Sequence, residues 1–377
     1  MPELSRPGRI RLALLITELD VGGAERCLTN LACGLVSSEY ELHVATLAPR
    51  PRDDQLVQRL VGAGVAVTHL DLRGGAQWLT AIRRVRDWLG RVEPTALQTF
   101  LFHANAIGCL AAGSKIPVAT GIRVADPRRW RSWVERWACR RAARIVCVSE
   151  RVAEFARQRL AVSSDDGRIV EIPNGIAIEP IASGDRSWWS GSADAPLAVY
   201  VGRLDRQKGI DWLLSVAGEV CRRCSTCQFV FVGAGSAGEA LQRRADELGV
   251  ADRCHWLGWR QDACDIIASS RLVVLPSRWE GMPNVVLEAM HAARPVVCTR
   301  VEGAEQLLGD SPEQLVDFGD DRRLADQLIA LLSDDELAAS LGSRNRARVS
   351  EHFSLRRMIA SYDAMYRELT EAAAKVP

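Results

Sequence analysis

The chain has 377 residues, which is enough for two domains of ordinary size, each with its own core. Its 47% hydrophobic and 25% charged residues are typical of a folded enzyme and argue against a largely disordered chain. The formal net charge of +1 excludes a general electrostatic attraction to nucleic acid or to an anionic membrane, so no nucleic-acid partner is expected and any membrane contact must be local.

The cysteines and the apolar segments indicate a cytoplasmic protein. The 11 cysteines lack the paired spacing that staples small secreted domains. The first apolar run, residues 12–17, is too short for the core of a signal peptide. No segment approaches the roughly 20 apolar residues that a membrane-spanning helix needs. We therefore expect a cytoplasmic location, at the inner face of the membrane where a local surface favours it.

The first half of the chain alternates apolar runs of strand length with helical patterns. This rhythm predicts a parallel sheet with helices on both of its faces. The runs are RLALLIT, ELHVATL and residues 65–70, 96–100, 117–121 and 144–148. Residues 1–175 are therefore expected to form a first Rossmann-like domain.

A second series of the same kind follows a segment rich in Pro, Gly, Ser and Asp, which predicts an interdomain linker over residues 176–196. The new series predicts a second doubly wound domain over residues 197–354. Its strands are LAVYVGRL, QFVFVGAG, RCHWLGW, RLVVLPS and PVVCTR. Helical periodicity from about Phe353 predicts a last helix, and residues 355–377 are expected to pack back on the first domain. Because loops at the carboxyl ends of parallel strands hold ligands, a ligand that bridges both domains is expected in the cleft between them.

Two cations follow the first strand of the second domain. LAVYVGRL runs into DRQKGID, which places Arg203 and Lys208 five residues apart at a turn that opens a helix. A guanidinium and an ammonium beside a helix N-terminus suit a diphosphate, because they neutralise the charge of a departing phosphate. A solvated basic turn is the alternative. Lysine occurs only at positions 115, 208 and 375, which favours the functional interpretation.

Two carboxylates follow a later strand of the same domain. After RLVVLPS comes RWEGMPNVVLEAM, in which Gly281 belongs to a turn and Asn284 is expected to cap a helix. Backbone N–H groups near Asn284 and Val285 are expected to meet a phosphate. Glu288, about one turn into the helix, is placed to accept hydrogen bonds from ribose hydroxyls, and Glu280 from sugar hydroxyls. Complementation of the helix dipole is the alternative for Glu288.

The two motifs together carry a family resemblance. GRLDRQKGID, followed about seventy residues later by SRWEGMPNVVLEAMHAARPVV, resembles the retaining GT-B glycosyltransferases of the family-four type, also called glycosyl transferases group 1. The segments TELDVGGAERCLTNLACGL, IVCVSE and IPNGI extend the resemblance over most of the chain. It implies two Rossmann-like domains facing across a cleft, with an acceptor domain at 1–175 and a nucleotide-sugar donor domain at 197–354.

The resemblance also implies roles for particular residues. Arg203 and Lys208 match the family residues that bind the donor diphosphate, and Glu280 and Glu288 match the two glutamates of its E-x7-E motif. His103, in QTFLFHANAIG, looks like the family's active-site histidine, although a lone histidine after a strand is more often structural. The expected catalytic set is therefore His103, Arg203, Lys208 and Glu280.

Other candidates follow strands of the first domain. Gly22 and Gly23 lie between the first strand and the first helix, where glycine lets a loop approach the donor closely; a simple tight turn is the alternative. Arg123, in GIRVADPRR, is expected to face the acceptor. Asp126 is expected to cap the helix that begins near Pro127.

By this resemblance the reaction is a metal-independent transfer, with retention, from a nucleoside-diphosphate sugar to a saccharide or lipid-linked saccharide in cell-surface glycan synthesis. UDP is the expected nucleotide and GDP the second. The sequence contains no Asp-x-Asp pair to hold a divalent ion, so Arg203 and Lys208 would replace that ion and no cofactor is expected. VEGAEQLL replaces a more glycine-rich family loop, which leaves the donor sugar open.

A basic helix rich in tryptophan is predicted over residues 127–144. Trp130, Trp133 and Trp137 share one face of it, and arginines occupy most of the remainder. Such a stripe suits the headgroup region of a membrane, where it would bring the enzyme to a lipid-linked acceptor. The alternative is a domain helix with core tryptophans and solvated arginines, and both interpretations stay open.

Two further motifs, and one alternative that rests on no motif, remain to be considered. GAGSAG at 233–238 fits the dinucleotide pattern G-x-G-x-x-G, and Arg260 would suit a 2′-phosphate, so an NADP-dependent oxidoreductase is one alternative. A catalytically silent nucleotide-sugar-binding relative is another. CRRCSTC at 221–227 has the spacing of a metal site, but no fourth ligand is obvious, and buried cysteines are the favoured interpretation.

Overall fold

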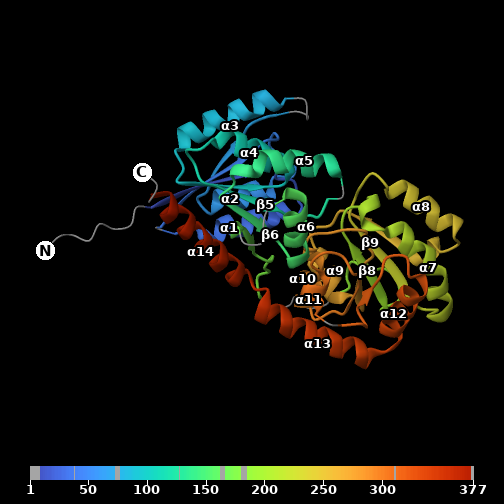
Figure 1. Ribbon diagram of the computed structural model, residues 1–377. Coiled ribbons are helices and arrows are strands. Elements are labelled where there is room, and N and C mark those ends of the chain that lie inside the picture. Colours follow the sequence, from blue (N-terminus) through green and yellow to red (C-terminus); the bar gives the residue numbers. More distant parts are fainter. Residues whose placement is uncertain are drawn as a thin grey trace. The chain divides into compact units, whose positions relative to one another are not determined.

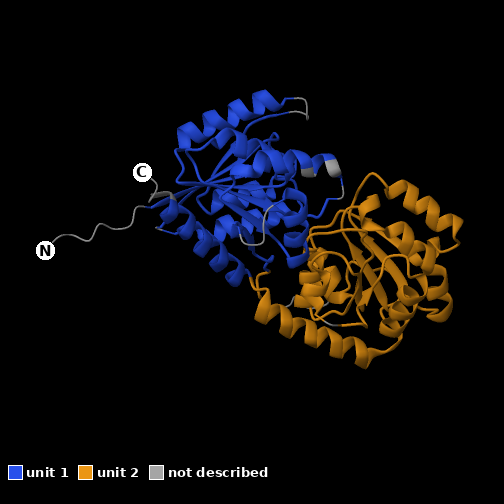
Figure 2. Ribbon diagram, viewed as in Figure 1, with its two compact units in different colours: residues 1–175, 355–377 blue, residues 176–354 orange. Residues whose placement is uncertain are grey.

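The computed structural model describes residues 9–37, 39–72, 77–126, 128–161, 166–179, 185–309 and 311–374. The chain divides into two compact units (Figure 2). Unit 1 comprises residues 1–175 and 355–377, and unit 2 comprises residues 176–354. Each unit contains its own parallel sheet, covered by helices (Figure 1).

Unit 1 contains a seven-stranded sheet in the order β3-β2-β1-β4-β5-β6-β7, and all its neighbouring strands are parallel. The strands are β1 (Ile10–Ile16), β2 (Tyr40–Thr46), β3 (Ala66–His69), β4 (Ala96–Phe100), β5 (Val118–Ile122), β6 (Arg144–Cys147) and β7 (Ile169–Glu171). The central strand β1 is fully buried from Leu12 to Ile16, because helices cover both faces of the sheet. This explains its continuous apolar run.

The helices of unit 1 include the end of the chain. They are α1 (Gly23–Leu35), α2 (Gln55–Gly62), α3 (Trp78–Val92), α4 (Phe102–Ala112), α5 (Arg129–Ala138), α6 (Glu150–Leu160) and α14 (Leu355–Ala374), with a 3-10 turn η1 at Cys139–Arg141. α14 lies beside α1 (Figure 1). Its residues Met358, Tyr362, Met365 and Leu369 are buried in the core of unit 1. These four residues recur at helical spacing and therefore form the face of α14 that packs into the core of unit 1.

Unit 2 contains a six-stranded sheet in the order β10-β9-β8-β11-β12-β13, again parallel throughout. Its strands are β8 (Leu197–Val201), β9 (Gln228–Val232), β10 (Cys254–Gly258), β11 (Leu272–Leu275), β12 (Val296–Thr299) and β13 (Leu315–Val316). Its helices are α7 (Ile210–Arg223), α8 (Gly238–Glu247), α9 (Ala263–Ser269), α10 (Asn284–His291), α11 (Ala304–Leu308), α12 (Asp321–Ser333) and α13 (Asp335–His352), with 3-10 turns η3 (Arg206–Lys208) and η4 (Ala251–Arg253).

The segment interpreted as a linker belongs to unit 2, and its described residues are 176–179 and 185–196. The guanidinium of Arg186 and the indole of Trp188 both donate to Ser269, the former to its carbonyl and the latter to its hydroxyl. Trp188 and Trp189 also pack against a small core of unit 2. The tryptophans therefore anchor residues that composition alone assigns to a loop.

Both sheets have a point at which the strand order reverses, between β1 and β4 in unit 1 and between β8 and β11 in unit 2. In open parallel sheets, the loops at the carboxyl ends of such a strand pair separate and form a ligand-binding crevice. The expected residues Gly22, His103, Arg203 and Glu280 follow these four strands. Each sheet therefore presents its candidate residues at its topological switch point.

The prediction of two doubly wound parallel-sheet domains is confirmed. Two edge strands, β7 and β13, were not predicted, since runs of three and two residues are too short for a recognisable pattern.

No helix in the described ranges is both long and apolar enough to cross a bilayer.

Candidate functional site

Arg203 follows β8 with its side chain largely exposed. The exposed fraction of the side chain is 74%, and its Nε lies 3.7 Å from Oδ2 of Asp205. The backbone is fixed beneath it, because the hydroxyl of Tyr200 donates to the carbonyl oxygen of Arg203 at 2.7 Å. A guanidinium is thus presented to solvent from a rigid position at the carboxyl end of β8.

Lys208 and Glu280 form a buried ion pair between the loops after β8 and β11. The Lys208 Nζ lies 2.6 Å from Oε1 of Glu280, and the exposed fractions of the two side chains are 16% and 8%. The hydroxyl of Ser277 donates to the same oxygen at 2.7 Å. A buried carboxylate is tolerated when charge and hydrogen bonds satisfy it, as they do here.

Three side chains, which we name the loop clamp (Gln207, Asp211 and Arg278), tie these two loops together. The Gln207 amide donates to the carbonyl of Trp279, and the Arg278 N–H donates to the carbonyl of Gln207, both at 2.8 Å. The Arg278 guanidinium donates to the carbonyl of Arg206 at 2.7 Å and to both oxygens of Asp211 at 2.9 and 2.7 Å. The clamp therefore fixes the backbone on both sides of the Lys208–Glu280 pair.

Within the clamp, Asp211 and Arg278 each stabilise the charged form of the other. Hydrogen bonds from Arg278 lower the pKa of Asp211, and those to Asp211 raise the pKa of Arg278. Sequence reasoning missed the clamp residues and Ser277, although they adjoin the recognised motifs. Only the folded chain shows that two segments about seventy residues apart face each other.

Gly209 permits the close approach of the two loops. Its φ is +65°, and a Cβ built there would lie 2.0 Å from the carbonyl oxygen of Pro276. Any other residue would be strained and would also push the loops apart. The position directly after Lys208 therefore requires glycine on steric grounds. Gly209 also directly precedes the first residue of α7.

A third loop, after β12, supports Glu280 from its backbone side. The N–H of Glu280 donates to Oε2 of Glu302 at 3.0 Å. Gly303 has a φ of +79°, and a Cβ there would lie 2.4 Å from the carbonyl oxygen of Gly281. The segment VEGAEQLL, identified as a departure from the family pattern, thus packs directly on the Glu280–Gly281 turn.

α10 begins one position earlier than the sequence predicts. Asn284 is the first residue of the helix, and Pro283 occupies the preceding cap position with extended backbone. The expectation that Asn284 caps the helix is therefore corrected; the fixed φ of proline suits the entry to a helix. The N–H of Val286 donates to the carbonyl oxygen of Pro283 at 3.1 Å. The expected contact of the Asn284 and Val285 N–H groups with a phosphate stays a prediction. Glu288 is half-buried, about one turn further along.

In unit 1, the glycine pair after β1 makes room for a carboxylate. Gly22 precedes α1 with an extended φ of −140°, and a Cβ there would lie 2.2 Å from Oε2 of Glu25. Glu25 is itself buried. The end of the Glu25 side chain thus folds back over Gly22, and Gly23 begins the helix.

His103 lies at the start of α4, after β4. Its ring packs edge-on to Phe102 at 5.0 Å and lies 6.1 Å from Trp78. Burial, with a smaller contribution from Arg131, lowers the pKa of His103, so the neutral imidazole predominates at neutral pH. The preceding residue Leu101 has a φ of +72°, which is strained for a residue with a side chain. The sequence pattern did not predict this conformation.

Arg123 is turned into unit 1 rather than toward solvent. The residue is 8% exposed, its guanidinium donates to Oδ1 of Asn174, and it lies 5.9 Å from the centre of the Phe100 ring. Little of the residue is exposed, and the expected role of Arg123 toward an acceptor stays a prediction. Its observed contacts hold the Asn174 loop against the end of β4.

The turn before α5 is closed by Asp126. Its carboxylate accepts from the backbone N–H of Arg128 at 3.0 Å and from the guanidinium of Arg131 at 2.9 Å. The helix begins at Arg129, so Asp126 closes the preceding turn instead of capping the helix itself. Pro127 lies outside the described residues.

The tryptophans of α5 lie on the surface of unit 1. Trp130, Trp133 and Trp137 are 55%, 71% and 56% exposed. The alternative in which they form part of the core is therefore wrong. Trp130 still contacts Phe102 edge-on at 5.4 Å, which links the stripe to the residue beside His103.

The glycines of GAGSAG are explained by packing between two loops of unit 2. A Cβ at Gly233 would lie 2.0 Å from the carbonyl oxygen of Gly202, and one at Gly235 would lie 2.3 Å from that of Leu204. Glycine is needed here so that the loop after β9 can lie against the Arg203 loop. This removes the reason to interpret the motif as a dinucleotide site.

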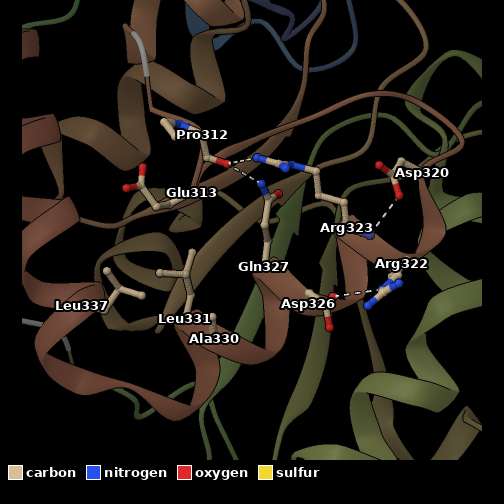
Figure 3. A pocket seen from close by; sticks show the side chains of 10 residues that line it. All are labelled: Pro312, Glu313, Asp320, Arg322, Arg323, Asp326, Gln327, Ala330, Leu331 and Leu337. Atoms are coloured by element: carbon tan, nitrogen blue, oxygen red, sulfur yellow. Dashed lines mark hydrogen bonds and ion pairs between the residues drawn. The ribbon is translucent and has the colours of Figure 1, made fainter.

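A hollow of about 470 Å³ in unit 2 is lined by other residues, between the 312–313 loop and α12 (Figure 3). Arg323 and Gln327 both donate to the carbonyl oxygen of Pro312, at 2.8 and 2.7 Å. These polar groups therefore hold the loop against α12. Within the described ranges, no group of three or more His, Cys, Asp or Glu side chains is arranged to hold a metal ion.

Known proteins share both the sequence and the fold of this chain. Residues 21–179 match the family Glycosyltransferase Family 4, and residues 195–334 match Glycosyl transferases group 1. The alpha-D-kanosaminyltransferase of Streptomyces kanamyceticus is 29% identical over 264 residues, 68% of each chain. The lipopolysaccharide core biosynthesis glycosyltransferase LpsE of Rhizobium meliloti is 28% identical, over 58% of this chain and 62% of that protein. The chain thus spans about two thirds of the length of these relatives.

The fold has close counterparts among solved structures. HepE of Anabaena, crystallised in complex with UDP and glucose, aligns with a TM-score of 0.82 over 96% of this chain and 100% of its own, at 19% identity. That likeness shows the fold, and the two family matches cover the segments that carry the candidate residues of both units. The chain belongs to the GT-B glycosyltransferases of the family-four type, enzymes of glycan synthesis.

Proposed function

We propose that the enzyme transfers a sugar, with retention and without a metal ion, from a nucleoside-diphosphate sugar to a saccharide or lipid-linked saccharide. UDP is the favoured nucleotide and GDP the second. The observation that carries the proposal is the buried Lys208–Glu280 pair, with exposed Arg203 beside it at the carboxyl ends of neighbouring strands.

The diphosphate is held by cations and backbone N–H groups of unit 2. Arg203 approaches from solvent and Lys208 from the clamped loop, while the first turn of α10, at Asn284 and Val285, offers N–H groups and the positive end of a helix dipole. As the bond to the sugar breaks, negative charge grows on the leaving phosphate. Fixed cations stabilise that charge without reorganisation, which is the role a divalent ion plays in other enzymes.

Glu280 and Glu288 orient the sugar and the ribose. One oxygen of Glu280 already accepts hydrogen bonds from Lys208 and Ser277, so this carboxylate is held as an acceptor for sugar hydroxyls rather than as a nucleophile. With no enzymic nucleophile, the acceptor attacks on the face that the phosphate leaves. We also propose a catalytic role for His103, whose neutral imidazole can donate or accept a hydrogen bond.

The choice of UDP and of a glycan acceptor rests on the relatives. HepE was crystallised with UDP-glucose, and LpsE acts in lipopolysaccharide core biosynthesis. On α5, the exposed Trp130, Trp133 and Trp137 lie beside the exposed Arg136. Aromatic rings at the headgroup level and guanidinium groups at lipid phosphates would bring the enzyme to a lipid-linked acceptor.

Calorimetric titration of the full chain tests the donor part first. UDP, GDP and NADPH are each added in the presence of a chelator and again with Mg²⁺. Binding of one nucleoside diphosphate that is equally tight in both buffers supports the proposal and identifies the donor class. Binding that needs Mg²⁺, or binding of NADPH alone, contradicts it.

Product analysis tests the chemistry and separates the enzyme from a catalytically silent relative. The matching nucleotide sugar is incubated with the protein, with and without saccharide acceptors, and the anomeric configuration of the product is read by NMR. Release of nucleotide with a retained configuration is expected. An inverted product would refute the retaining mechanism, and binding without any turnover would favour the silent relative.

Vesicle sedimentation tests the membrane part separately. The protein should sediment with vesicles that contain anionic lipid and not with neutral ones, and replacement of Trp133 by Ala should weaken this binding severalfold. Replacement of Trp256, which stacks on Phe231 inside unit 2, is the control on a tryptophan away from α5. Equal sedimentation of the wild type and Trp133→Ala would remove α5 from the proposal.

A further inference from the structure

Four cysteines gather at the edge of the unit 2 sheet where the strands begin. Cys221 lies in the last turn of α7, Cys224 follows that helix, Cys227 precedes β9, and Cys254 begins β10. β9 and β10 are neighbouring strands, so Cys254 lies close to the CRRCSTC segment, which ends where β9 begins. The donor-binding candidates follow the opposite, carboxyl ends of the strands. These thiols are therefore remote from the proposed reaction.

The thiol of Cys227 is in direct contact with that of Cys221 and also has a hydrogen-bond interaction with that of Cys224. The Sγ of Cys227 donates to the Sγ of Cys221 at 3.9 Å. Cys227 is fully buried, whereas Cys221 is partly exposed. An oxidant from solvent would therefore meet Cys221 first, with Cys227 directly behind it.

Charge around the pair also distinguishes its two members. The hydrogen bond from Cys227, followed by the nearby Arg253, lowers the pKa of Cys221, while burial and Asp252 act in the opposite direction. The pKa of Cys227 is raised, first by that same hydrogen bond and then by burial. The shared hydrogen bond therefore acts in opposite directions on the two thiols, lowering the pKa of the more exposed cysteine and raising that of the buried one.

Arg253 also fixes the segment between the two cysteines. Its guanidinium donates to the carbonyl oxygens of Ser225 and Cys227, the latter at 3.4 Å. The N–H of Cys227 donates to the carbonyl of Cys224 at 3.2 Å, which closes a tight turn. The pair is thus held together by backbone contacts as well as by its own hydrogen bond.

We propose that Cys221 and Cys227 form a peroxide-reactive dithiol, with Cys221 as the attacking residue and Cys227 as the resolving residue. The Cys221 thiolate attacks one oxygen of hydrogen peroxide, the O–O bond breaks, and hydroxide leaves with the electron pair. Cys221 is then a sulfenic acid. The Cys227 sulfur attacks that sulfur and gives up its proton, and the hydroxyl leaves as water. The two thiols and one peroxide thus yield one disulfide and two waters, and a low-molecular-weight thiol reverses the reaction by exchange.

The local structure permits the bond to form. The two sulfurs must close from 3.9 Å to the roughly 2.05 Å of a disulfide. Cys221 is in the last turn of α7, and helix ends open more readily than helix centres. The movement is therefore confined to the end of one helix, while β9 stays in the sheet.

Another partly exposed cysteine of the chain provides a matched control. Cys33 in unit 1 is also partly exposed, but burial raises its pKa and its thiol donates to the carbonyl of Arg59 instead of contacting a second thiol. Cys264 in unit 2 is exposed and controls for accessibility alone. If exposure alone determined the rate of oxidation, Cys264 would react fastest. If the contact between the two thiols determines it, Cys221 reacts fastest.

The test uses the full-length reduced protein and one equivalent of hydrogen peroxide. Aliquots are quenched with an alkylating reagent over time, digested without reductant and mapped by mass spectrometry. We expect a Cys221–Cys227 disulfide as the main product, forming at least about tenfold faster than oxidation of Cys33 or Cys264, and full reversal by a thiol. Faster oxidation of either control cysteine, or a main disulfide that joins other cysteines, would overturn the proposal.

Single serine variants separate the two roles. In Cys227→Ser, a sulfenic acid should accumulate at Cys221 and be trapped by a dimedone probe. In Cys221→Ser, Cys227 should resist peroxide, because it is fully buried and burial by itself also raises its pKa. Trapping at Cys227 in the second variant, or no trapping at Cys221 in the first, contradicts the assigned roles. Circular dichroism of both variants shows whether the fold is retained, and Cys33→Ser should react like the wild type.

Discussion

Unit 1 and unit 2 place their candidate residues at equivalent points of two similar sheets but support them differently. In unit 2, the loops after β8, β11 and β12 are joined by hydrogen bonds and by the buried Lys208–Glu280 pair. In unit 1, the start of α4 carries aromatic contacts around His103, and Arg123 is buried against Asn174. On the proposed function, the fixed charges of unit 2 stabilise a charged leaving group, and the rings of unit 1 offer contact surface to an acceptor of variable shape.

The largest effect should come from the ion pair itself. Lys208→Ala removes the buried cation, and we expect turnover to fall about 10²- to 10⁴-fold, because the leaving phosphate loses its stabilisation. Steady-state kinetics with the nucleotide sugar measures this. Lys115→Ala, at an exposed lysine of unit 1, should keep wild-type turnover. Near-wild-type turnover in Lys208→Ala would refute the unit 2 site.

A pair of glycines isolates the close approach of the unit 2 loops. Gly209 and Gly249 have nearly the same φ, +65° and +68°, but only at Gly209 would a Cβ meet another atom, 2.0 Å away at the Pro276 carbonyl. Gly209→Ala should lower the free energy of unfolding by about 3 kcal/mol or more, and Gly249→Ala by about 1 kcal/mol. Urea denaturation measures both. Equal losses of unfolding free energy in the two variants would show that the close approach of the loops does not contribute to the cost of Gly209→Ala.

The clamp should contribute a smaller effect that acts through Lys208. Arg278→Gln frees the Arg206 and Asp211 ends of the clamp, and we expect kcat/KM for the donor to fall about tenfold. When Lys208 is already replaced by Ala, the further fall in kcat/KM caused by Arg278→Gln should be close to zero, because the clamp then has no cation to position.

A matched arginine at the other end of α7 controls for this clamp prediction. Arg223 pairs with Asp326 at 2.7 Å, far along the helix from Lys208. Arg223→Gln should change kcat/KM by less than about twofold. A full, additive loss for Arg278→Gln in the Lys208→Ala background would mean that Arg278 acts on stability alone.

Glu135 offers the corresponding test in unit 1. Its carboxylate accepts from the buried Asn105 amide at 3.4 Å, beneath α5, and burial raises its pKa to about 7. The unfolded chain releases this proton at lower pH, so the folded state binds more protons between about pH 4.5 and 7 and stability falls as pH rises through that window.

Glu135→Gln should therefore stabilise the protein by about 1 to 2 kcal/mol at pH 8 and by much less below pH 5. Thermal unfolding across this range measures the difference. Glu154→Gln, at an exposed residue of the next helix, should show no such trend. A pH-independent effect of Glu135→Gln would mean that its carboxyl group is solvated.

Much of the fold could be predicted, and the candidate residues of unit 2 could be proposed, because both rest on local patterns. The alternation of apolar runs predicted both sheets, and GRLDRQKGID and SRWEGMPNVVLEAM predicted Arg203, Lys208, Glu280 and Glu288 as candidates. The clamp could not be predicted, since nothing in the neighbourhood of Gln207 or Arg278 indicates which distant segment it meets.

Candidates in unit 1 were less predictable for a related reason. Arg123 follows a strand, as a ligand-facing residue would, yet its guanidinium found a partner inside the unit, in Asn174. Trp130, Trp133 and Trp137 have the spacing of a core face but lie on the surface. Direction relative to the core is a tertiary property, so strand position and helical period do not settle it.

The sequence by itself determined the two doubly wound sheets and the charged motifs at their switch points, since hydrophobic period and turn residues act over a few positions. Only the tertiary structure decided which loops touch, which glycines are needed and which arginine is buried. Those outcomes depend on contacts between segments far apart in the chain. The thiol pair shows both contributions: the spacing of CRRCSTC is local, whereas the charge of Arg253 and the burial of Cys227 come from the fold.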